Sequence, residues 1–159
     1  MIRFDLGTRR FNYRIVGVAI HDEQVLLHRA EHETFWTCPG GRAEFGEAAE
    51  DTIKREMREE LDTEIEVIRL LWFVENFFEY EGLSYHELAV YFLIRFPDGS
   101  RPLASRGFES ADQGVKLLFQ WVPVNVKVLT ELPLLPAFLP AGLVDLPASM
   151  VHLVERTEA

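Results

Sequence analysis

Alternating apolar and polar residues run through most of the chain and predict a fold built mainly of strands. Two apolar runs near the N-terminus are joined by the polar turn His21-Asp22-Glu23, the pattern of two neighbouring strands. Further along, two long alternating segments meet at Glu81-Gly82 and predict a hairpin, in which His86 and Glu87 face opposite sides of the sheet. The strands predicted in chain order are 15–20, 24–28, 64–80, 83–96, 118–124 and 150–155.

One segment has the period of a helix instead. From about Glu47 to Leu61 the apolar residues recur every four positions, and the first turn is acidic, as the positive end of a helix dipole favours. A glycine-containing loop, residues 36–41, precedes this helix. Residues 98–114 are polar and predict another loop, and a proline-interrupted helical region follows residue 124. This order of elements predicts an α/β (α+β) fold in which helices cover a central mixed sheet.

The composition fits a single globular domain over residues 1–159, because 48% of the residues are hydrophobic and no low-complexity linker interrupts them. Cys38 is the only cysteine, so no disulfide can form within the chain and a reducing, cytoplasmic setting is expected. No signal peptide is visible, and no apolar run approaches the roughly 20 residues of a membrane helix. No membrane partner is therefore expected.

The net charge of −10 argues against binding to DNA or RNA polymers, because both are polyanions. The same charge constrains any small ligand that carries phosphate. An acidic protein can hold such a ligand only where a cation stands between the two, and a divalent metal ion bound by clustered carboxylates would meet this need.

Three glutamates on the predicted helix form such a cluster. Glu56, Glu59 and Glu60 are spaced i, i+3, i+4, and helical geometry places Glu56 and Glu60 beside the apolar stripe with Glu59 farther out. Like charges at this spacing cost about 0.2–0.5 kcal/mol per pair on an exposed helix, and a hard cation would compensate. The alternative is a solvated acidic helix face stabilised by pairs such as Glu50 with Lys54.

The context of these glutamates is specific. Gly41, five residues, Glu47, seven residues and then Arg55-Glu56-Met57-Arg58-Glu59-Glu60 resembles the signature of the Nudix hydrolases, the MutT-like family, with every charged position at the family's spacing. Asp62 and Thr63 stand where the family has a Gly and an apolar residue, which affects the turn after the helix more than the chemistry. The resemblance assigns no subfamily. It implies a Nudix-like α/β/α sandwich around a central mixed β-sheet.

The resemblance also implies roles for the residues of this signature. It implies a Mg²⁺ site, with Mn²⁺ as the other ion considered, whose ligands are Glu56, Glu59, Glu60 and the Gly40 carbonyl. Arg55 would tie Glu47 to the glutamates, so the catalytic residues implied are Glu56, Arg55 and Glu47. The general base is left open between Glu56 and three carboxylates outside the signature, which are Glu75, Glu87 and Glu109.

The candidates for substrate binding are Gly41, Trp36 and Tyr80. Trp36 would either stack on a base or anchor its loop in the core. Tyr80 is near the position of a tyrosine in Nudix enzymes that act on dinucleoside polyphosphates, although a tyrosine-rich strand would also place one there. The proline of ADP-ribose-type members is missing around Glu79, which counts against that substrate. His28 and His32 flank the loop near the glycines and could reach a phosphate, but they are interpreted as surface residues, the more frequent case for histidine.

The function implied is metal-dependent hydrolysis of a diphosphate linkage in a nucleoside diphosphate linked to another moiety. Within the enzyme class, a dinucleoside polyphosphate or a (d)NTP is the other kind of substrate. The alternative is a non-catalytic Nudix-like domain that binds a nucleotide as a sensor, but such domains usually lose a charged residue of the signature and none is lost here. The expected partner is a small nucleotide-type molecule, and a homodimer is left open.

Overall fold

The strands that the sequence predicts are present in the computed structural model, which describes residues 1–157. The described strands are β1 (Arg3–Leu6), β2 (Arg9–His21), β3 (Gln24–Ala30), β4 (Gly40–Arg42), β5 (Glu66–Tyr80), β6 (Leu83–Arg95), β7 (Gly107–Asp112), β8 (Val115–Pro123) and β9 (Val151–Arg156). The described helices are α1 (Ala49–Leu61), α2 (Val126–Glu131) and α3 (Leu139–Val144), with the 3-10 turn η1 (Arg101–Leu103).

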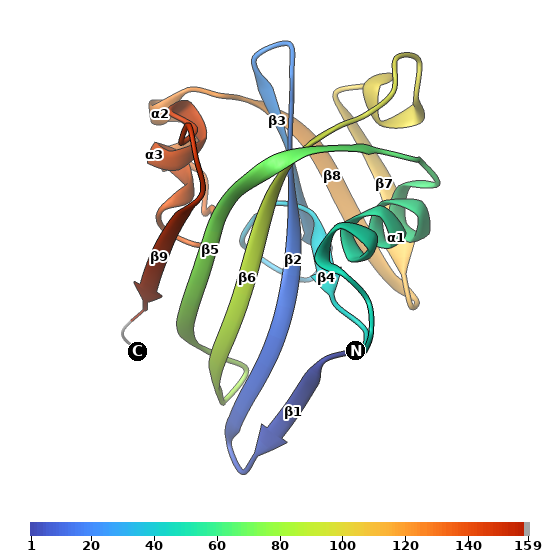
Figure 1. Cartoon of the computed structure of the whole chain (residues 1–159). Coiled ribbons are helices and arrows are strands. Elements are labelled where there is room, and N and C mark those ends of the chain that lie inside the picture. Colours follow the sequence, from blue (N-terminus) through green and yellow to red (C-terminus); the bar gives the residue numbers. More distant parts are fainter. Residues whose placement is uncertain (158–159) are drawn as a thin grey trace.

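The strands follow the order β7-β8-β3-β2-β6-β5-β9, and both β1 and β4 also pair with β2. The pairs β2 with β6 and β5 with β9 are parallel, whereas neighbours such as β5 and β6 are antiparallel, so the predicted mixed sheet is confirmed. β2 and β3 share only two residue pairs, Ile20 with Val25 and His21 with Gln24. Beyond them the strands diverge, and β3 leads into a second layer with β8 and β7 (Figure 1).

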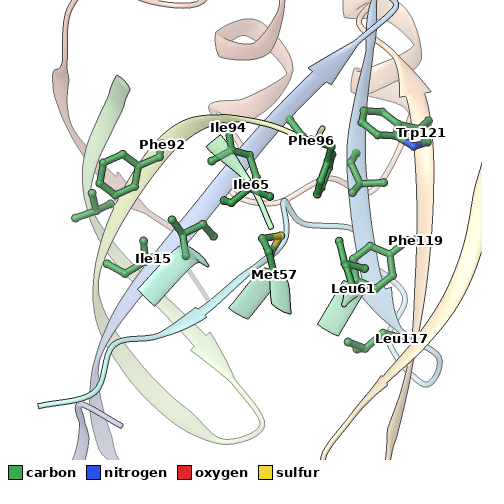
Figure 2. Packing of buried hydrophobic residues seen from close by; sticks show 14 of the residues in the cluster. Ile15, Met57, Leu61, Ile65, Phe92, Ile94, Phe96, Leu117, Phe119 and Trp121 are labelled. Carbon is green, nitrogen blue, oxygen red and sulfur yellow. The ribbon is translucent and has the colours of Figure 1, made fainter. Parts of the chain in front are cut away.

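α1 packs its apolar stripe into a core that lies between the two layers. Ile53, Met57 and Leu61 are at most 1% exposed and belong to a cluster that includes residues of β2, β6 and β8 (Figure 2). Ile15 points into this core and Val16 into a second one, because consecutive strand residues face opposite sides of a sheet. The second core lies under α2 and α3. Helices therefore cover both faces, as expected for an α/β/α sandwich.

The strongly periodic segments are where the sequence places them. The hairpin of β5 and β6 turns at Glu81 and Gly82, which both have positive φ, and Tyr80 pairs with Leu83. α1 begins at Ala49, two residues later than predicted, and the last predicted strand is confirmed as β9. The described residues contain no helix with the length and hydropathy of a membrane span.

The prediction of a loop over residues 98–114 is wrong in part, because η1 and β7 lie within it. β7 pairs antiparallel with β8 from Gly107 opposite Gln120 to Asp112 opposite Val115. It is an edge strand whose residues are exposed or half-buried, so it needs few apolar side chains and has the composition of a loop. β1 and β4 were not predicted either, since four and three residues are too short to show a period.

Candidate functional site

The site is built where β4 meets α1, and two glycines make this contact close. Gly40 and Gly41 pair with Val16 and Ile15 of β2. A Cβ atom on Gly40 would lie 2.1 Å from the Ile15 carbonyl oxygen, and one on Gly41 would lie 2.1 Å from the carboxyl carbon of Glu56. Glycine at position 41 therefore allows the Glu56 carboxylate to rest directly against the strand.

The ladder between β2 and β4 also sets the direction of the Gly40 carbonyl. The Gly17 N–H donates to the Pro39 carbonyl at 2.8 Å, and the Ala43 N–H donates to the Tyr13 carbonyl at 3.1 Å. Because hydrogen-bonded and non-hydrogen-bonded pairs alternate in an antiparallel ladder, Gly40 occupies a non-hydrogen-bonded position. Its carbonyl is thus turned away from β2, as a main-chain ligand would require.

Arg55 connects the acidic residues of the signature and uses all five of its N–H groups. Nε and Nη2 donate to the two carboxylate oxygens of Glu47 at 2.8 and 3.0 Å, and Nη2 also donates to the Arg42 carbonyl at 3.0 Å. Nη1 donates to Glu56 at 2.8 Å and to Glu59 at 3.2 Å. The contacts implied for Arg55 are therefore present. The Arg55 guanidinium is the main reason that the pKa of Glu47 is lowered to about 2.

Burial divides the three glutamates of α1 as the helical periodicity predicts. Glu56 and Glu60 are 8% and 5% exposed, whereas Glu59 lies on the surface. Burial, with a smaller contribution from the charge of Glu56, raises the pKa of Glu60 to about 8. Burial also raises the pKa of Glu56, although Arg55 opposes it. For both glutamates, desolvation raises the pKa more than the crowding of like charges on α1 does.

His28 lies beside Glu60, and its burial is the main difference from the site that the sequence predicted. Its imidazole is buried, and Nδ1 lies 4.0 Å from Oε2 of Glu60; neither atom has a hydrogen-bond partner among the described residues. Burial, reinforced by the charge of Arg14, lowers the pKa of His28 to about 3, so the ring is neutral near pH 7. The interpretation of His28 as a surface residue is wrong, because it continues the apolar run of β3. His32 is exposed as expected.

The three glutamates do not converge as closely as the sequence suggested. Arg55 holds Glu56 and Glu59, Glu60 faces His28, and no three His, Cys, Asp or Glu side chains within residues 1–157 are grouped to hold a metal ion. The donor set nevertheless fits a hard cation. Oε2 of Glu60 is a buried acceptor without a donor, and a carboxylate oxygen in that state is what Mg²⁺ would satisfy.

The two aromatic candidates for substrate binding have partners of their own. Arg29 lies over the Trp36 ring at 5.2 Å, and the Trp36 N–H of the main chain donates to the Pro133 carbonyl. The Tyr80 hydroxyl donates to Glu33 at 2.7 Å, and its ring meets Phe35 edge to face. These contacts anchor the segment before the glycines, so substrate binding by Trp36, Tyr80 and Gly41 stays a prediction.

The general-base candidates outside the signature are engaged elsewhere. Oε2 of Glu75 lies 2.8 Å from Nε2 of His152, and Oε1 of Glu109 lies 3.1 Å from Nζ of Lys116. Glu87 is buried and accepts from Nδ2 of Asn12 at 2.7 Å, while His86 on the opposite face is exposed, as the strand alternation predicts. Glu56 is thus the candidate that lies within the Arg55 network.

Comparison with known proteins agrees with this geometry. Residues 12–137 match the family model of the NUDIX domain. The chain is 27% identical over 84 residues to the "Putative ADP-ribose pyrophosphatase YjhB" of Bacillus subtilis (strain 168), covering 52% of this chain and 40% of that protein. It is 32% identical over 90 residues to the "Putative mutator protein MutT4" of Mycobacterium tuberculosis (strain CDC 1551 / Oshkosh), covering 57% of this chain and 33% of that protein.

The chain therefore spans less than half the length of either curated relative. Among solved structures, an ADP-ribose pyrophosphatase from Streptococcus suis 89-1591 has a TM-score of 0.61 at 14% identity, covering 91% of this chain and 98% of that one, which shows a shared fold. Because the family model matches most of its length and the signature residues lie together in this fold, the chain belongs to the NUDIX domain family.

Proposed function

We propose that the protein is a pyrophosphohydrolase that uses a divalent metal ion to cut a diphosphate linkage in a nucleoside diphosphate linked to another group. The observation that carries this proposal is the Arg55 network, which holds Glu47, Glu56 and Glu59 in one arrangement beside the unpartnered Glu60 oxygen. A domain that had lost catalysis would have no need of this complete set of charges.

In this proposal the ligands of the ion are Glu56, Glu59, Glu60 and the Gly40 carbonyl. A bound Mg²⁺ or Mn²⁺ would neutralise phosphate charge and lower the pKa of a bound water. The chain's own residues fix the geometry: Arg55 orients two of the carboxylates, Glu47 holds Arg55, and Gly41 leaves room for Glu56. Most of the rate enhancement would then come from positioning and charge stabilisation.

Glu56 is the proposed general base. Its carboxylate is buried, lies against β4 and accepts from Arg55 through Oε1 alone, so the two lone pairs of Oε2 are left for the metal ion and for a proton. The raised pKa of Glu56 brings it closer to neutral pH than that of an ordinary carboxylate, which favours proton transfer. Glu75 and Glu109 are less suited, since each is paired with a cationic or titratable side chain outside the network.

The proposal is tested with a panel of nucleotides assayed in the presence of Mg²⁺, Mn²⁺ or EDTA. The panel contains ADP-ribose, which the name of one relative gives, together with nucleoside triphosphates and dinucleoside polyphosphates, the other kinds of substrate considered from the sequence. Hydrolysis should require the metal ion. Nucleotide binding without turnover of any member would instead support the sensor function.

The variant Glu59→Gln tests the ligand assignment within that assay. It keeps the shape of a surface side chain and removes one negative charge, so the fold should survive while kcat falls about 10²-fold or more. Glu50→Gln is the matched control, because Glu50 is also exposed on α1 and lies outside the Arg55 network. Equal turnover by the two variants would refute the role of Glu59.

A further inference from the structure

Two arginines stand side by side on the strands that carry the site. Arg14 of β2 and Arg42 of β4 are directly opposite each other. The ladder bonds at Tyr13 with Ala43 and at Gly17 with Pro39 place this pair in a non-hydrogen-bonded position, where facing side chains approach most closely. Like charges directly opposite in a sheet are destabilising, so this arrangement needs a compensating group.

No acidic side chain of residues 1–157 supplies that compensation through a salt bridge. Arg10, Arg58 and Arg95 each pair with a carboxylate, whereas Arg14 and Arg42 do not. The one side-chain hydrogen bond of Arg42 goes from Nη1 to the Met1 sulfur at 3.7 Å, and its Nε is buried without a partner. Arg29 and Arg69 are also partly buried without a salt bridge among the described residues, so Arg14 and Arg42 are distinguished by facing each other directly across one pair of strands.

The pair lies beside the proposed metal site. The charge of Arg14 acts on Glu56 and on Glu60, in both cases lowering a pKa that burial raises. The Arg42 carbonyl accepts from Arg55. Because Gly41 faces Glu56, its neighbour Arg42 faces the opposite side of β4. β2 is the strand partner of β4 among the described strands, so the other edge of β4 is open and a chain of phosphates along that edge can contact the glutamate side and the arginine side together.

We propose that Arg14 and Arg42 form an anion subsite for a phosphoryl group that the metal ion does not hold. The inference rests on the proposed function for the identity of the ligand, a nucleotide. A diphosphate that joins a nucleoside to a sugar has both phosphates at the reacting linkage and a neutral group beyond it. Two guanidiniums instead match a terminal phosphate, which carries charge and several acceptor oxygens. The subsite therefore favours nucleoside triphosphates over ADP-ribose.

A simpler role would be that Arg14 offsets the charge of Glu56 and Glu60 at a distance. That role does not account for the buried Nε of Arg42, which has no hydrogen-bond partner, although the charge of Glu87 acts on Arg42. It also predicts that Arg14→Gln changes kcat/KM by the same factor for every substrate. An anion subsite predicts that removing either arginine lowers kcat/KM, and that the fall is largest for substrates with an additional phosphate.

Calorimetric titration with inorganic tripolyphosphate in EDTA tests the subsite without metal or catalysis. The proteins compared are the parent chain, Arg14→Gln, Arg42→Gln and the control Arg9→Gln, which removes the same charge from an exposed residue on the opposite face of β2. Each subsite variant should weaken binding by at least about 10-fold, the size expected for a charged hydrogen bond, and Arg9→Gln should not. Equal affinity in all four proteins would overturn the proposal. Melting temperatures of the subsite variants should not fall, since like-charge repulsion is removed.

Steady-state kinetics with Mg²⁺ then tests the substrate class. The subsite variants should lower kcat/KM for a nucleoside triphosphate by at least about 10-fold more than they lower it for ADP-ribose. An equal fall for both substrates would overturn the preference and support the offsetting role. If the parent chain hydrolyses nothing in the panel, the proposed function fails, while the calorimetry still decides whether the two arginines bind phosphate.

Discussion

Arg55 is the residue on which the arrangement of the site depends most. Its five N–H groups serve three carboxylates and one carbonyl, a fork that an ammonium group cannot reproduce. Arg55→Lys should therefore lower both the melting temperature and kcat at pH 7. Arg58→Lys is the control, since Arg58 is an exposed residue of the same helix that pairs with Glu64 alone.

The pH dependence of this loss identifies its cause. Arg55 holds the pKa of Glu47 at about 2, below its ordinary 4.5, so the pair stabilises the fold above pH 4.5 and loses that stabilisation as the pH falls toward 2. The difference in melting temperature between the parent chain and Arg55→Lys should be largest near pH 7 and should shrink below pH 4.5. Circular dichroism melts across this range measure it. A difference that does not change with pH would show that packing, and not the ion pair, is lost.

Asp62, at the C-terminal end of α1, has a strained backbone conformation. Asp62 has φ 50° and ψ 44°, in the left-handed region, and its N–H donates to the Arg58 carbonyl at 3.0 Å. The Nudix signature has a glycine here, which adopts this conformation without strain. Asp62→Gly should raise the free energy of unfolding by about 0.5 kcal/mol, a gain limited by the greater freedom of glycine in the unfolded chain.

Asp62→Ala is the informative comparison, because alanine lacks the polar side chain that helps Asp to tolerate this region. It should be less stable than the parent chain in urea denaturation, so that stability follows the order Gly, Asp, Ala. Neither change should affect kcat, since the Asp62 side chain is exposed and makes no contact in the Arg55 network. If alanine proved as stable as glycine, backbone strain at this position would be excluded.

Elements differ in how far the sequence alone predicts them. α1 and the hairpin of β5 and β6 were predicted because each repeats its period over 13 or more residues. β7 was missed because an edge strand can be polar, and β4 because three residues show no period. The resemblance to the Nudix signature implied the contacts of Arg55 with Glu47 and Glu56, and these three residues lie within α1 and the loop before it.

The rest of the site depends on register between segments remote in sequence. His28 meets Glu60 because β3 and β8 fold back over α1, and Arg14 meets Arg42 through pairing of β2 with β4. No pattern within either segment fixes such a register. The apolar run before His28 was the available signal that its side chain is buried.

At the scale of the whole molecule, Glu60 and His28 make stability depend on pH in opposite directions. Burial raises the pKa of Glu60 from 4.5 to about 8, so its contribution is full below pH 4.5 and is lost as the pH rises toward 8. Burial lowers the pKa of His28 from 6.5 to about 3, so its contribution is full above pH 6.5 and is lost as the pH falls. Of these two groups, only Glu60 changes its contribution to the free energy of unfolding between pH 6.5 and 8.

The metal-free protein should therefore become less stable as the pH rises from 6.5 to 8. Thermal melts in EDTA should show this decrease for the parent chain and a smaller one for Glu60→Gln, which cannot ionise. Adding Mg²⁺ at pH 8 should restore the melting temperature of the parent chain more than that of the variant, because the ion replaces the lost proton. Identical pH profiles for the two proteins in EDTA would contradict the assignment of this slope to Glu60.

Cys38 is buried, so the rate at which its thiol is alkylated can report the opening of the segment around it. The thiol is 1% exposed, burial raises its pKa to about 12, and it lies two residues before Gly40 in the segment between β3 and β4. Because the thiolate is the reactive form, alkylating reagents can modify the folded chain only after this segment opens. With one cysteine in the sequence, the labelling rate reads that opening at a single place without any engineered probe. Nucleotide and Mg²⁺ bound at the glycines should slow the labelling of Cys38. The labelling rate would then measure how often the segment beside the site opens.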